Sequence, residues 1–141
     1  MFKCNPKKSN FKEYKKFCLN SLEPGVPQFC ENYIFHKLVC GKEIVCIIGH
    51  QYSNEPKTYL VGSFSKNSSK YIRDLIEWGK IYLDFISKGP IEIIVETGQK
   101  TFERFATYFG FEKTLAQIDI NGIMCTVYTR ASKCLPHQLY L

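Results

Sequence analysis

The segment from Gln99 to Phe111 reads QKTFERFATYFGF and decides the fold. Its apolar residues recur at intervals of one, three and four, which places them on one face of a helix. We therefore predict a short helix from about Lys100 to Phe109. Gly110 follows directly, and glycine readily adopts the left-handed conformation that ends a helix. The residues expected to point inward are Phe102, Phe105, Ala106 and Phe109.

Strand patterns flank this helix on both sides. Ile91–Glu96 is rich in β-branched residues, which favour strands. After the helix, Phe111–Ile120 and Ile123–Thr129 are separated by Asn121-Gly122, and Asn-Gly suits the tight turn of a hairpin. The carboxyl-terminal half of the chain is thus predicted to be strand, helix and hairpin.

The amino-terminal half adds two helices and three strands. A first helix from about Phe11 to Leu22 has Asn10 as its cap. The predicted strands are Tyr33–Cys40, Glu43–Gly49 and Thr58–Phe64, and a long helix covers about Lys70–Ser87. This element order predicts one α/β domain with a mixed sheet flanked by helices. We divide the chain into a helix and connecting segment (1–30), an α/β core (31–130) and a tail (131–141).

The long helix carries two apolar faces, although a surface helix needs only one. One face is expected on the sheet and consists of Ile72, Leu75, Ile76, Gly79, Leu83 and Ile86. The other is a candidate partner-binding surface, because exposed apolar patches mark interfaces. It consists of Tyr71, Trp78, Ile81, Tyr82 and Phe85. The alternative is that the segment up to Pro27 covers this second face.

Composition excludes several classes of protein. The 141 residues are 45% hydrophobic and 15% aromatic, which argues against disorder. No apolar run approaches the roughly 18–20 residues of a membrane span, and the first residues lack the apolar core of a signal peptide. Seven cysteines include no Cys-x-x-Cys pair, so we predict no metal site. We expect Cys18, Cys40, Cys46 and Cys125 as core thiols in a reducing compartment.

The net charge of +6 is concentrated near the amino terminus. A solvated helix face and tail would account for it, and contact with nucleic acid is the alternative. No nucleic-acid-binding motif accompanies these lysines. The basic residues concerned are Lys3, Lys7, Lys8, Lys12, Lys15 and Lys16.

The element order and the segment Gln99–Phe111 resemble the GNAT superfamily of acyl-CoA N-acyltransferases. The segment is similar to the family pattern Asn-x-x-Ala-x-x-x-Tyr-x-x-x-Gly-Phe. By element order the resemblance extends over about Tyr33–Arg130. Within the superfamily, the chain looks most like the small GNAT-like core or internal virion proteins of short-tailed phages, in which an Arg-Phe pair stands where Arg104-Phe105 stands here.

Two departures from the family pattern bear on function. The family holds the pyrophosphate of coenzyme A with a glycine-containing loop that opens the long helix, and the corresponding stretch Ser65–Tyr71 has no glycine. Ser68, Ser69 and Lys70 remain weak candidates for phosphate binding, or act as ordinary helix caps. The family tyrosine that protonates the leaving thiolate aligns with Ala106, and Tyr108 is about 200° further around the helix.

Two other residues are candidate bases if the chain is active. Glu96 ends a strand at the edge where α/β active sites gather, and His50 follows another strand. Glu92 is about 13 Å from Glu96 along the strand, too far to act with it. The alternative for each is a solvated strand-end residue.

These observations predict a catalytically degenerate GNAT-like protein without a cofactor. It would act through protein contacts as a phage virion or assembly component, in the host cytoplasm or the virion, not secreted and not transmembrane. The second hypothesis is an acetyl-CoA-dependent N-acetyltransferase that uses Glu96 or His50. A third is a nucleic-acid-associated protein.

Overall fold

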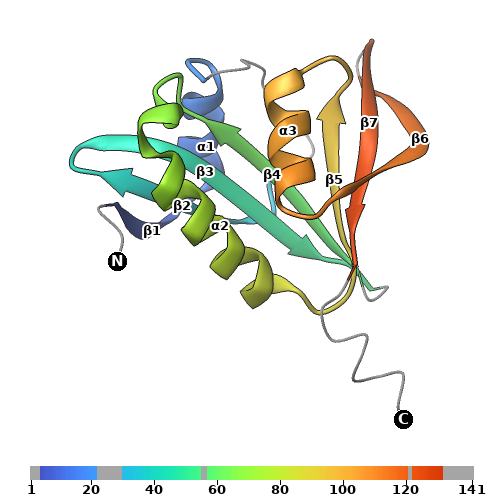
Figure 1. The fold of residues 1–141 in the computed structure, drawn as a ribbon, viewed down its shortest axis with the longest axis horizontal. Coiled ribbons are helices and arrows are strands. Elements are labelled where there is room, and N and C mark those ends of the chain that lie inside the picture. Colours follow the sequence, from blue (N-terminus) through green and yellow to red (C-terminus); the bar gives the residue numbers. More distant parts are fainter. Residues whose placement is uncertain (1–3, 22–29, 55–56, 121, 132–141) are drawn as a thin grey trace. The chain divides into compact units, whose positions relative to one another are not determined.

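The computed structural model describes residues 4–21, 30–54, 57–120 and 122–131. Their hydrogen-bonded strand order is β1-β2-β3-β4-β5-β7-β6. β4 and β5 run parallel, whereas β1 with β2, β2 with β3, and β7 with both β5 and β6 run antiparallel. The predicted mixed sheet with flanking helices is confirmed (Figure 1). The elements are β1 Asn5–Ser9, α1 Phe11–Cys18, β2 Ile34–Cys40, β3 Glu43–Tyr52, β4 Thr58–Phe64, α2 Ile72–Ile86, β5 Ile91–Glu96, α3 Lys100–Tyr108, β6 Glu112–Ile120 and β7 Ile123–Arg130.

The chain forms two compact units, and β4 and α2 each contribute to both. The first unit contains β1, α1, β2, nearly all of β3, the end of β4 and most of α2. The second contains the start of β4, the last turn of α2, β5, α3, β6 and β7.

In the first unit, side chains of β2 alternate between two helices. The ring of Phe35 stacks on Tyr14 of α1 at 4.8 Å, whereas the ring of His36 meets Tyr82 of α2 edge-on at 5.6 Å. Successive strand residues point to opposite faces, so α1 and α2 cover opposite faces of β2. Asn10 caps α1 as predicted, since its side chain accepts a hydrogen bond from the Glu13 N–H at 2.8 Å.

The amino-terminal segment differs from the prediction in two respects. α1 ends at Cys18 instead of Leu22, and Ser21 leaves the helix to bridge to Ser65. Asn5–Ser9 forms a strand that pairs with β2, so the segment 1–30 contributes to the sheet. β1 contains a proline and two lysines, a composition tolerated at a sheet edge but not typical of strands.

The burial of α2 corrects the predicted choice of faces. Trp78 and Tyr82, assigned to an open face, are 5% and 6% exposed, whereas Ile72, assigned to the core, is 42% exposed. Ile81 and Phe85 are exposed as expected. Tyr82 is buried because its hydroxyl meets Nδ1 of His50 at 2.6 Å, which satisfies the polar tip of the side chain. The buried stripe of α2 is Asp74, Leu75, Trp78, Gly79, Tyr82, Leu83 and Ile86.

In the second unit, side chains of β7 form hydrogen bonds with α3 and with Phe109 at its end. The Tyr128 hydroxyl donates to the Glu103 carboxylate at 3.4 Å, and Arg130 Nε donates to the Phe109 carbonyl at 3.0 Å. Gly110 has a φ of 87° and ends α3 as predicted. Residues 132–141, the predicted tail, lie outside the described residues.

The described part of the chain shows where the predicted core thiols lie. Cys18, Cys46 and Cys125 are buried free thiols, and Cys40 is partly buried. No group of histidine, cysteine or acidic side chains that could hold a metal ion occurs among the described residues. None of the described helices has the length and apolar character needed to span a membrane.

Candidate functional site

The loop before α2 is the predicted place for a phosphate, and its backbone donors are largely engaged within the loop. The N–H groups of Ser68 and Lys70 donate to the carbonyls of Ser65 and Asn67 at 3.0 Å each. The Asn67 N–H donates to Ser65 Oγ at 3.1 Å. A pyrophosphate loop needs amides that point outward, so these amides do not form such a cradle.

The carboxylate of Glu43, at the start of β3, accepts hydrogen bonds from side chains of the same loop. Glu43 accepts hydrogen bonds from Asn67 Nδ2 at 3.1 Å, from the Tyr71 hydroxyl at 2.9 Å and from Ser65 Oγ at 3.4 Å. The side-chain donors of Asn67, Tyr71 and Ser65 are therefore already hydrogen-bonded to Glu43 and are not available to an anionic ligand. Sequence analysis did not identify Glu43, because it lies 22 to 28 residues from its three partners.

The ionisation of this group follows from its contacts. Hydrogen bonds from Asn67 and then Tyr71 lower the pKa of Glu43, so the carboxylate is charged at neutral pH. The same carboxylate raises the pKa of Tyr71 to about 12, mainly through the hydrogen bond, so its hydroxyl stays protonated and donates. The loop is therefore hydrogen-bonded to a charged carboxylate of the chain itself, that of Glu43, which we call the internal anion.

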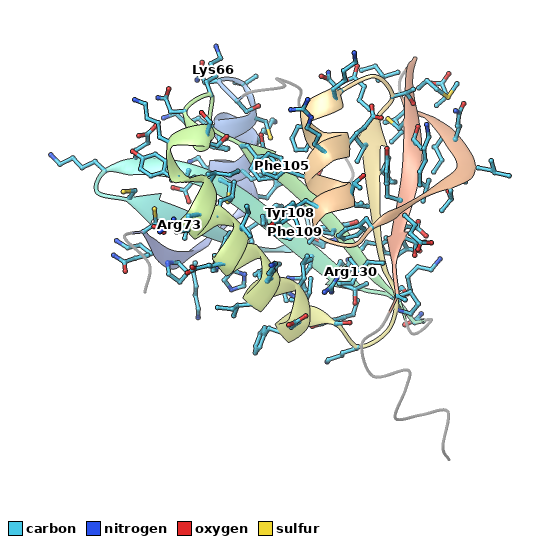
Figure 2. The ribbon with its side chains drawn as sticks, in the orientation of Figure 1. Lys66, Arg73, Phe105, Tyr108, Phe109 and Arg130 are labelled. Atoms are coloured by element: carbon cyan, nitrogen blue, oxygen red, sulfur yellow. The ribbon has the colours of Figure 1, made fainter. Side chains whose placement is uncertain are left out.

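Exposed cationic side chains occur on the same segment of the chain, and the charge of Lys70 also lowers the pKa of Glu43. Lys66, Lys70 and Arg73 are exposed on the loop and the first turn of α2, and Figure 2 labels Lys66 and Arg73. Of the predicted phosphate-binding residues, Ser68 is buried, whereas Ser69 and Lys70 are exposed. The loop can thus offer cationic side chains to a phosphate, but few free backbone amides.

Ala106 and Tyr108, the two α3 positions compared with the family tyrosine, differ in their exposure to solvent. Ala106 is 4% exposed, and its carbonyl accepts the Phe111 N–H at 2.9 Å. Tyr108 is 57% exposed and packs edge-on against Phe109 at 5.7 Å (Figure 2). Position 106 therefore supplies no acidic proton, and Tyr108 does not share its inward face.

The two candidate bases have different environments. Glu96 is exposed at the end of β5 and accepts a hydrogen bond from Gln99 Nε2 at 3.0 Å. Glu92 is paired with Lys57 at 3.2 Å. His50 is 4% exposed and lies within β3, which continues to Tyr52, so it is not a solvated strand-end residue. Of the two candidates, Glu96 is the one that a solvent-borne amine can reach.

Solved structures share this fold over nearly their whole lengths. A variant of the spermidine N-acetyltransferase from Vibrio cholerae matches with a TM-score of 0.69 at 10% identity, covering 97% of this chain and 98% of that one. A GNAT family acetyltransferase from Elizabethkingia anophelis with acetyl-CoA bound matches with a TM-score of 0.66 at 10% identity, covering 92% and 98%. An N-acetyltransferase from Staphylococcus aureus matches with a TM-score of 0.65 at 14% identity, covering 91% and 97%.

The fold is GNAT-like. No family model matches the chain, and no curated protein matches it either. At these identities the likeness concerns the GNAT-like fold alone. These three similar structures are acetyltransferases.

Proposed function

We propose that the chain is an acyl-CoA-dependent N-acyltransferase with an atypical phosphate-binding loop. The observation that carries this proposal is the GNAT-like fold, shared over more than nine-tenths of the chain with acetyltransferases, one of which has acetyl-CoA bound. The virion role that the sequence suggested has no comparable support.

Acetyl-CoA would supply the thioester whose acyl group an amine accepts. On this chain, Lys66, Lys70 and Arg73 would neutralise the phosphates of that cofactor. Glu96 is the candidate base that takes the proton from the attacking amine, directly or through a water. Because residue 106 is alanine, this position cannot supply a proton to a leaving thiolate.

Glu43 sets the affinity for the cofactor in this proposal. Its negative charge lies among the donors at the start of α2, so it opposes an incoming phosphate. Glu43→Gln removes the charge and keeps one oxygen acceptor, for either Asn67 or Tyr71. We expect this variant to bind acetyl-CoA about tenfold more tightly than the wild type.

Calorimetric titration with acetyl-CoA tests the proposal. The matched control is Glu77→Gln, which removes an exposed carboxylate from α2. We expect weak binding, above the low micromolar range, by the wild type and the control, and tighter binding by Glu43→Gln. Absence of binding by all three proteins at about millimolar acetyl-CoA would refute the proposal.

The second candidate function is protein binding by a degenerate GNAT-like chain. It is favoured by the internal anion in the loop, by Ala106 and by the exposed apolar residues Ile81 and Phe85. An assay of coenzyme A thiol release from acetyl-CoA in the presence of spermidine distinguishes the acyltransferase function from the protein-binding function. Turnover that falls about a hundredfold in Glu96→Gln supports the enzyme. No turnover in either protein favours the binding role.

A further inference from the structure

A cavity on the second unit lies outside the loop described above. Its volume is about 560 Å³, within the range of small-molecule sites. Residues of α3, β6 and β7 line it, and these elements belong to the same unit. Its lining on α3 includes Lys100, Arg104 and Tyr108, away from the inward position of Ala106.

The charge of the cavity is positive. Lys100, Arg104 and Lys113 line it together with one carboxylate, Glu103. In the described part of the chain, ion pairs involve Glu13, Glu92 and Asp84, and none involves these three cations. Three cations that converge without an acidic partner attract an anion.

The single carboxylate is engaged by neighbouring donors. Glu103 accepts hydrogen bonds from the Gly98 N–H at 3.2 Å and from the Tyr128 hydroxyl at 3.4 Å. Burial, and then Glu103, raises the pKa of Tyr128, so the hydroxyl remains a donor at neutral pH. Glu103 therefore holds α3 to β7, and its charge is partly compensated there.

The lining also favours a particular shape of anion. The guanidinium fork of Arg104 matches the oxygens of a phosphate, and the two lysines add charge. Tyr108 is 57% exposed and lines the cavity, so the exposed part of its ring can pack against an aromatic ring of a ligand. A phosphate attached to a flat ring satisfies both features.

We propose that this cavity binds a nucleotide-like ligand, with its phosphate at Lys100, Arg104 and Lys113 and its ring on Tyr108. This proposal does not depend on the acyl-transfer chemistry proposed above. A ligand there would contact α3 and β6 together.

Calorimetric titration with adenosine monophosphate tests the site, with adenosine and inorganic phosphate as partial ligands. We expect binding at roughly 0.1–1 mM, with both partial ligands at least tenfold weaker. Arg104→Gln and Lys113→Gln should each weaken binding about tenfold, and Tyr108→Ala about fivefold, at unchanged melting temperature. The matched control is Lys15→Gln, which removes an exposed lysine of α1.

Three results would overturn the site. The first is no binding of the monophosphate up to about 5 mM. The second is an equal loss in Lys15→Gln and Arg104→Gln, which would indicate non-specific attraction by the net charge. The third is equal binding of adenosine and the monophosphate, since the cationic residues would then have no role. Because acetyl-CoA is absent from the assay, failure here leaves the acyltransferase proposal untouched.

Discussion

Replacement of Trp78 by alanine tests the packing of α2 most directly. The indole is 5% exposed, and its ring centre lies 5.4 Å from that of Tyr82. Truncation of a buried tryptophan costs about 3–5 kcal/mol, through lost apolar burial and the cavity that remains. For a chain of this size, that loss lowers the melting temperature by roughly 10–20 °C.

Phe85→Ala is the matched control for this measurement. Phe85 lies on the same helix but is 80% exposed, so its removal should change stability by about 0.5 kcal/mol or less. Urea denaturation and thermal melts of both variants provide the comparison. A melting temperature of Trp78→Ala within about 2 °C of the wild type would refute the buried assignment. Equal destabilisation by both variants would refute the difference between the two faces.

Two further predictions concern the first unit. A Cβ at Gly49 would lie 2.5 Å from the ring of Phe35, so Gly49→Ala should lower stability by about 1–3 kcal/mol. Gly62→Ala, whose Cβ would meet its nearest atoms at 3.7 Å, should be nearly neutral in the same urea denaturation. Burial and then Lys8 lower the pKa of His36, so the unfolded chain takes up this proton first and stability falls as the pH drops below about 6.5. Denaturation of His36→Gln across this range should show a smaller decline, and an identical decline would contradict the assignment.

The candidate site residues were harder to predict from the sequence than the helices and strands, because their surroundings depend on contacts between distant segments. Sequence reasoning identified Ala106 in place of the family tyrosine and the missing loop glycines, because both are local departures from a pattern. It placed His50 in solvent, whereas Tyr82 covers this side chain from 32 residues away. It missed Glu43, whose contacts with the loop before α2 form only after β3 and α2 come together.

The sequence by itself determined most of the strands and the helices α2 and α3, because strand alternation, helical spacing and turn glycines act over a few residues. Thus β4 and β5 begin and end where the pattern predicts, and Gly110 ends α3. Only the tertiary structure decided which face of α2 is buried. Both faces are apolar, and the outcome depends on the surface that β2 and β3 present. His50 on β3 offers the hydroxyl of Tyr82 a hydrogen-bond partner, so an amphipathic side chain is buried there while Phe85 remains in water.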